Sequence, residues 1–299
     1  MNIPGRGDLR ISLTSACNLS CSYCHNEGMG MPWLTDKINI ELDDIEWLLA
    51  IASKHGVKSV KLTGGEPGMS PVILPLLKKL KYFKEKYPAE YSIVTNGIPF
   101  LSSKKLTTLL NSGIDRVNLG IDSLLEDEFS KPDSPNGVSG HTLLDKLLPN
   151  LKNHGISIKI NCVFTGNIPR AESVIDFMSG KEVVSIIEVD PGKNVQFNKG
   201  TRNEFINLID YTAKKYNLKA RQFRVFNETY LYKDDKLWVK FYQDHCADKD
   251  CETCRKIHFR VNSSLEATPC FLKSDKTIPL TDEKAFALAI EKNGMGPNW

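Results

Sequence analysis

Residues 9–216 alternate between short apolar, β-branched runs and longer segments with helical periodicity. This alternation is typical of a parallel sheet whose crossover connections are helices. The apolar runs predict strands over residues 9–14, 57–63, 91–95, 116–121, 156–164 and 184–189. The periodic segments predict helices over residues 42–52, 76–87, 102–111, 141–153, 170–178 and 203–216. We therefore expect an α/β fold of about six βα units, a partial (βα)6 TIM-like barrel.

The pattern changes near residue 217. Residues 221–242 are rich in aromatic and β-branched side chains with partial alternation, and a group of cysteines follows them. This change predicts a boundary between a barrel over residues 1–217 and a small C-terminal region over residues 218–299.

Composition excludes several classes of protein. The 299 residues are 41% hydrophobic and 25% charged, which excludes a disordered, collagen-like or coiled-coil chain. No apolar stretch reaches the roughly 18 to 20 residues that span a bilayer, and no apolar segment follows Met1, so we expect a cytoplasmic protein without a membrane or secretory segment. The net charge is +3, and the basic residues are spread along the chain, which argues against a dedicated nucleic-acid binder.

Seven of the eight cysteines fall into two groups. Cys17, Cys21 and Cys24 lie near the N-terminus; Cys246, Cys251, Cys254 and Cys270 lie near the C-terminus. The remaining one, Cys162, lies in an apolar run and is expected in the core. In a chain without an export signal, such clusters indicate metal binding more than disulfides.

The N-terminal group has the spacing Cys-x3-Cys-x2-Cys and falls in the loop after the first predicted strand. Three thiolates in one short loop can converge on an iron–sulfur cluster, whose fourth iron then stays open to a chelating amino and carboxylate group. The alternative is a zinc knuckle with His25 as the fourth ligand. That alternative is awkward because the successive side chains of Cys24 and His25 diverge.

Gly64, Gly65, Glu66 and Pro67 follow the second predicted strand. Glycines there let backbone groups approach a ligand closely and turn sharply, although an ordinary strand-ending turn has the same composition. In a parallel sheet this segment and the cysteine loop both lie at the carboxyl ends of the strands, where active sites are normally found.

Together the two motifs resemble those of the radical S-adenosylmethionine (SAM) enzymes. The resemblance implies that Cys17, Cys21 and Cys24 bind a [4Fe–4S] cluster and that residues 64–67 line the SAM amino group. It also implies reductive cleavage of SAM to a 5′-deoxyadenosyl radical, which abstracts hydrogen from a substrate.

Residues 10–19, 95–97, 113–124 and 159–161 are similar to the molybdenum-cofactor GTP 3′,8-cyclase (MoaA) branch of that family. The similarity implies that Arg10 contacts a nucleotide substrate, that Tyr23 lies beside the adenine of SAM and that Lys159 meets the SAM carboxylate. It also implies a cofactor-binding role for Thr95, Asn96 and Ser123. The ordinary alternatives are a surface charge at Arg10 and a simple turn at residues 95–97.

The C-terminal cysteines resemble the ligands of that branch's auxiliary [4Fe–4S] cluster. Cys251, Cys254 and Cys270 match its three ligands, which leave one iron free for guanine, and His258 and Arg260 take the positions of two substrate-binding arginines. Cys246 is a fourth candidate that would close the cluster. Four thiolates also suit a structural zinc site.

Several departures from the branch leave the substrate open. Two extra residues separate Cys254 from Cys270, Ser185 replaces an arginine that contacts SAM, and the chain ends without the branch's Gly–Gly. The leading hypothesis is GTP 3′,8-cyclisation with an electron donor such as flavodoxin or ferredoxin. The alternatives are a paralogue that oxidises, epimerises or rearranges another small molecule or modifies a peptide, and a zinc-dependent binding protein.

Metal analysis separates the enzyme hypotheses from the zinc hypothesis. Anaerobically purified protein is expected to contain iron and sulfide, because closely spaced thiolates suit iron–sulfur clusters. Zinc without iron and sulfide at both cysteine groups would overturn both enzyme hypotheses.

Overall fold

A computed structural model describes residues 8–29, 38–125, 138–189, 199–223, 228–244, 258–268 and 277–292. Cys246, Cys251, Cys254 and Cys270 lie outside these ranges, so their predicted roles stay predictions.

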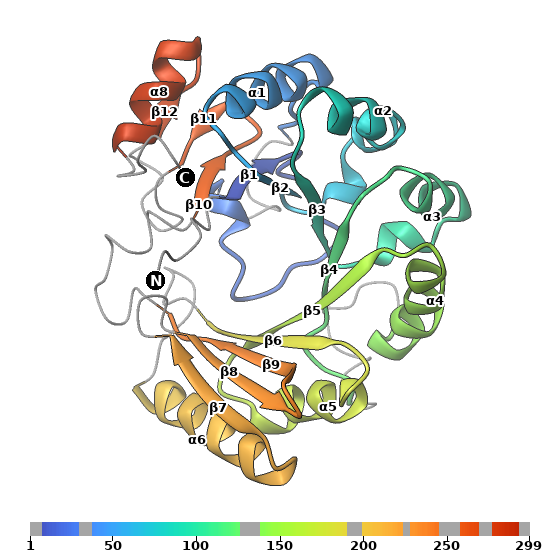
Figure 1. The fold of residues 1–299 in the computed structure, drawn as a ribbon, viewed down its shortest axis with the longest axis vertical. Coiled ribbons are helices and arrows are strands. Elements are labelled where there is room, and N and C mark those ends of the chain that lie inside the picture. Colours follow the sequence, from blue (N-terminus) through green and yellow to red (C-terminus); the bar gives the residue numbers. More distant parts are fainter. Residues whose placement is uncertain are drawn as a thin grey trace.

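Six parallel strands alternate with six helices, which confirms the predicted partial (βα)6 barrel. The strands are β1 (Asp8–Ser12), β2 (Ser59–Thr63), β3 (Glu90–Thr95), β4 (Arg116–Gly120), β5 (Ser157–Phe164) and β6 (Val183–Glu188). The helices are α1 (Leu42–Lys54), α2 (Ile73–Lys86), α3 (Ser103–Leu110), α4 (Gly140–Asn153), α5 (Ile168–Met178) and α6 (Lys199–Lys215). The sheet curves into an arc with these helices along its outer side (Figure 1).

The C-terminal part of the chain extends both edges of this sheet. At one edge β9 (Lys236–Tyr242) pairs in parallel with β6, and β8 (Glu228–Lys233) and β7 (Lys219–Phe223) follow antiparallel. At the other edge β10 (His258–Val261) pairs in parallel with β1, followed by β11 (Glu266–Ala267) and β12 (Ile278–Pro279). Helix α8 (Glu283–Lys292) comes last. The change in sequence pattern near residue 217 thus coincides with the start of the antiparallel strands. A separate C-terminal region over residues 218–299 stays a prediction.

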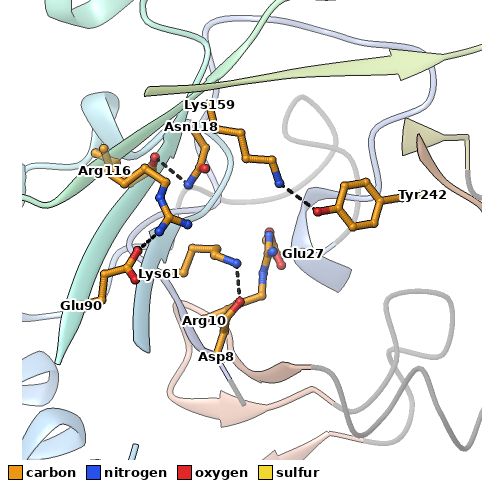
Figure 2. Close-up of polar contacts among 10 residues, drawn as sticks. Asp8, Arg10, Glu27, Lys61, Glu90, Arg116, Asn118, Lys159 and Tyr242 are labelled. Carbon is orange, nitrogen blue, oxygen red and sulfur yellow. Dashed lines mark hydrogen bonds and ion pairs between the residues drawn. The ribbon is translucent and has the colours of Figure 1, made fainter. Parts of the chain in front are cut away.

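Side-chain alternation along the strands separates an apolar layer from a polar barrel interior. In β1, Leu9 and Ile11 are fully buried in the apolar core. Asp8 and Arg10 point to the opposite side, where Figure 2 shows them with Lys61 and Lys159. Because successive residues of a strand face opposite sides, every second residue of the barrel strands is available for a polar site.

Among the described helices, none is both long enough and apolar enough to cross a bilayer.

Helix α2 offers a test of this core. Phe83 is fully buried beneath the helix, whereas its neighbour Tyr82 is half-exposed. Phe83→Ala is expected to lower the free energy of unfolding by about 3 to 5 kcal/mol, because it leaves a cavity. The matched variant Tyr82→Ala is expected to cost about 0.5 kcal/mol. Denaturant unfolding measures both, and equal costs would contradict the placement of α2.

Candidate active site

The loop after β1 brings Cys17, Cys21 and Cys24 together as partly exposed free thiols. Burial raises the pKa of Cys17 to about 11 and that of Cys21 to about 12, with smaller contributions from Glu66 at Cys17, from Asp122 at Cys21 and from Cys24 at both. Backbone N–H groups donate to two of the sulfurs, from Leu19 to Cys17 Sγ at 3.4 Å and from Asn26 to Cys24 Sγ at 3.3 Å. Such N–H···S bonds suit thiolates that hold an iron–sulfur cluster, so the donor set fits this group.

Gly64 and Gly65 pack directly on the backbone of the cysteine loop. Gly65 N–H donates to Thr14 O at 2.7 Å, and Glu66 N–H donates to Ala16 O at 2.8 Å. A Cβ at Gly65 would lie 2.4 Å from Ala16 O, and one at Gly64 would lie 2.6 Å from Thr14 O. The glycines are therefore required for contact between the two motifs, and not only for approach to a ligand.

Glu66 joins the ends of β2 and β3. Its buried carboxylate accepts hydrogen bonds from Thr95 Oγ at 2.6 Å, Asn96 N–H at 2.7 Å and Gly68 N–H at 2.8 Å. Burial raises the pKa of Glu66, and these donors oppose that rise. The amide of Asn96 donates in turn to Asn18 Oδ1 at 2.9 Å, in the cysteine loop. Residues predicted separately from three loops thus form one network.

A cavity of about 180 Å³ opens beside the cysteine loop. Its polar lining includes Cys21, Tyr23, Asn96, Asp122 and Ser123, and its apolar lining includes Leu19, Ile98, Ile121, Leu125, Val138 and Leu143. Apolar walls with a few polar groups suit a ring system that carries hydrogen-bonding edges.

Asp122 is a residue of this cavity that the sequence analysis did not single out, although it lies in the segment 113–124. Its carboxylate accepts hydrogen bonds from the hydroxyl of Tyr23 and from Val163 N–H, the latter at 2.8 Å. Asp122 therefore ties the cysteine loop to the carboxyl ends of β4 and β5.

Basic side chains of four strands gather in the barrel interior: Arg10 of β1, Lys61 of β2, Arg116 of β4 and Lys159 of β5 (Figure 2). Lys61 pairs with Asp8, and Arg116 pairs with Glu90.

Among these barrel cations, Lys159 forms no ion pair within the described ranges. It donates to Tyr242 Oη at 3.3 Å and lies 4.9 Å from the centre of that ring. Burial, together with the charges of nearby Lys240, Lys61 and Arg116, lowers the pKa of Lys159 to about 7, and Glu228 opposes this shift. The residue predicted to meet the SAM carboxylate thus lies among barrel cations, and its predicted role stays untested.

The pairing of β10 with β1 places Arg260 directly beside Arg10 and His258 beside Asp8. Glu27, which follows the cysteines, forms an ion pair with Arg10 and accepts a hydrogen bond from Thr63 Oγ at 2.9 Å. Arg10, His25 and Arg260 hold the pKa of Glu27 low, at about 2, against the effect of burial. The register thus brings Arg10 and Arg260 side by side from distant segments and places the strand that begins at His258 next to β1.

The zinc alternative at the N-terminal cysteines is not supported by the position of His25. Burial lowers the pKa of His25 to about 4, and its charged neighbours are Glu27, Arg10 and Arg260. Within the described ranges, no three His, Cys, Asp or Glu side chains form a group that could hold a single metal ion.

Comparisons with known proteins agree with this geometry. A family model described as the radical SAM superfamily matches residues 11–177. The probable GTP 3′,8-cyclase of Sulfurisphaera tokodaii is 29% identical over 286 residues, which cover 92% of this chain and 84% of that protein. The probable GTP 3′,8-cyclase of Pyrococcus horikoshii is 27% identical over 288 residues, covering 91% and 86%.

The fold is also that of a solved structure described as native anSMEcpe with bound AdoMet. The two chains superpose with a TM-score of 0.66 at 19% sequence identity, over 97% of this chain and 82% of that one.

The contact between the glycine segment and the cysteine loop can be tested by Gly65→Ala. The added Cβ meets backbone atoms of Ala16 and Ser15, which cannot move aside independently. We expect a loss of about 3 kcal/mol in the free energy of unfolding and a lower iron content after anaerobic reconstitution.

The matched control is Gly155→Ala, where no atom lies within 4 Å of the new Cβ. It is expected to cost about 1 kcal/mol, because the backbone there is left-handed, and to leave the iron content unchanged. Equal effects of the two variants would contradict the close packing at Gly65.

Proposed function

The chain belongs to the radical SAM superfamily, and we propose that it cyclises GTP by forming a bond between ribose C3′ and guanine C8. Membership implies a [4Fe–4S] cluster and SAM as cofactors. The observation that carries the choice of substrate is the set of cations inside the barrel, next to the cysteine loop. Relatives named probable GTP 3′,8-cyclase support the same choice over nine-tenths of the chain.

Different loop residues hold the cluster and the two ends of SAM. Cys17, Cys21 and Cys24 hold the cluster, and the cavity lined by Tyr23, Asp122 and Ser123 takes the adenosine of SAM. Residues 64–67, with Thr95 and Asn96, hold its methionine end. When bound, the cluster and SAM supply a 5′-deoxyadenosyl radical that removes a hydrogen atom from the substrate.

The barrel cations hold the triphosphate. Arg10 and Arg260 lie side by side on neighbouring strands, and Lys61, Arg116 and Lys159 face the same interior. Charge-assisted hydrogen bonds from these groups orient a polyphosphate in a partly buried site. Lys159 is available to an anion, because it forms no ion pair among the described residues and donates instead to the phenol of Tyr242.

The C-terminal cysteines complete this assignment. Cys251, Cys254 and Cys270 hold an auxiliary cluster, and Cys246 is its candidate fourth ligand. The support is that β10, which lies between Cys254 and Cys270 in the sequence, pairs with β1. The enzyme works in the cytoplasm, with flavodoxin or ferredoxin as its electron donor.

A second candidate is a paralogue that acts on another small molecule or a peptide. Ser185 favours it, because a buried serine stands on β6 where the GTP cyclases resembled by this chain have an arginine. The hydroxyl of Ser185 has no hydrogen-bond partner among the described residues, so it can accept a substrate group.

Anaerobic turnover with reductant, SAM and GTP deuterated at C3′ distinguishes the candidates. Deuterium in the 5′-deoxyadenosine, detected by mass spectrometry, is the expected result. Unlabelled 5′-deoxyadenosine would keep the enzyme in its family but remove GTP as the substrate.

Lys159 provides a pH test of the anion site. Because its pKa lies at about 7, its cationic form is lost as the pH rises above that value. The affinity for inorganic tripolyphosphate is expected to fall by up to about tenfold per pH unit above 7. In Lys159→Arg the slope is expected to be shallower, since guanidinium stays charged.

Calorimetry from pH 6 to 8.5 measures these slopes for tripolyphosphate and for SAM separately. Equal tripolyphosphate slopes in the wild type and in Lys159→Arg would contradict the phosphate role. If only the affinity for SAM depends on pH in this way, Lys159 binds the SAM carboxylate and not the phosphates.

A further inference from the structure

Glu27 lies among the barrel side chains and has an uncommon backbone conformation (Figure 2). Asn26 and Glu27 both have left-handed backbones, with φ of 48° and 52°. Each costs roughly 1 kcal/mol or more for a residue with a Cβ. The side chain of Asn26 stabilises the turn by donating to Ser15 O at 3.2 Å. This strained turn places the Glu27 carboxylate against Arg10 of β1 and Thr63 of β2.

The two carboxylate oxygens of Glu27 have different surroundings. Oε1 accepts hydrogen bonds from Arg10 at 2.5 Å and from Thr63 Oγ at 2.9 Å. Oε2 has no hydrogen-bond partner among the described residues, although Glu27 is only 7% exposed. An unsatisfied buried acceptor costs about 1 to 3 kcal/mol, more for a charged group.

A counter-ion role for Glu27 does not account for this asymmetry. Arg10 and Arg260 need a nearby anion because they lie side by side on neighbouring strands. A carboxylate that served only this purpose would use both oxygens on one guanidinium, which is the favoured geometry. Instead Arg10 Nε and Glu27 Oε2 are both left without partners among the described residues.

These two atoms are an unpaired donor and an unpaired acceptor in neighbouring side chains, which Figure 2 shows among the barrel residues. Glu27 also lies close enough to Cys24 to raise the pKa of that thiol, so it stands between the cysteine loop and the barrel cations. A group bound there would lie near the cofactors and beside the site of the anion.

We propose that Glu27 is a specificity residue whose free oxygen accepts a hydrogen bond from an N–H or O–H group of the barrel substrate. The inference rests on the proposed function and deepens it. In GTP the donors assigned to this contact are the 2-amino group of guanine and the 2′- and 3′-hydroxyls of ribose. A carboxylate selects for such donors, because a ligand without them leaves its charge unpaired.

The test is equilibrium binding of four nucleotides to the reconstituted enzyme without reductant: GTP, ITP, 2′-deoxy-GTP and 3′-deoxy-GTP. ITP lacks the 2-amino group, and each deoxynucleotide lacks one hydroxyl. In Glu27→Gln the amide oxygen stays on Arg10 and Thr63, so its NH₂ faces the substrate donor. We expect this variant to bind GTP about 10- to 100-fold more weakly, with iron content and SAM affinity unchanged.

The decisive readout is the pattern across nucleotides. For the analogue that lacks the recognised donor, the wild type and Glu27→Gln are expected to bind equally, and the identity of that analogue names the donor. The matched control is Glu90→Gln, which removes a different carboxylate from a barrel arginine, Arg116. It is expected to change all four affinities by the same factor.

Three results would overturn the proposal: an equal loss for all four nucleotides in Glu27→Gln, no change, or tighter binding. An equal loss would make Glu27 a structural counter-ion, and tighter binding would make it a competitor of the substrate for Arg10. A wild type that binds none of the nucleotides would overturn the proposed function itself, and this failure is visible without any variant.

Discussion

The buried ion pair between Glu27 and Arg10 joins the parts of the molecule that form the site. Glu27 belongs to the cysteine loop, Arg10 to the first strand, and Arg260 stands beside Arg10 on a strand from the C-terminal region. Two neighbouring arginines repel each other, and Glu27 offsets this repulsion, since Arg10 and Arg260 both lower its pKa. This contact therefore links the turn after the cysteines, the first strand and the strand added from the C-terminal region.

The cysteine loop contacts both parts of the site. Cys21 and Tyr23 line the cavity together with Asp122, and Glu27, which follows the cysteines, pairs with the barrel cation Arg10. The glycine segment packs on the backbone of this loop, so it sets the loop's position relative to both. A reactive group formed at the loop would be held close to a substrate in the barrel, and the short distance between them is what radical transfer requires.

The fold could be predicted because its signal is local. Apolar runs and helical stripes predicted six βα units, and the first strand, expected over residues 9–14, is Asp8–Ser12. The cysteine and glycine motifs could also be recognised from the sequence, because each lies within a short segment. The pairing of β10 with β1, the ion pair of Glu27 with Arg10 and the hydrogen bond from Tyr23 to Asp122 could not be predicted, because each joins distant segments and leaves no periodic pattern. The surroundings of Lys159 likewise depend on β9, which joins the sheet beside β6.

We propose that one barrel holds SAM beside the cysteine loop and a nucleoside triphosphate among the cations. The most direct test is a crystal structure of the anaerobically reconstituted enzyme with SAM and GTP. We expect SAM in the cavity of Tyr23 and Asp122, and GTP in the barrel with its phosphates on Arg10 and Lys159. GTP outside the barrel, or a triphosphate that touches none of the barrel cations, would rule out this arrangement.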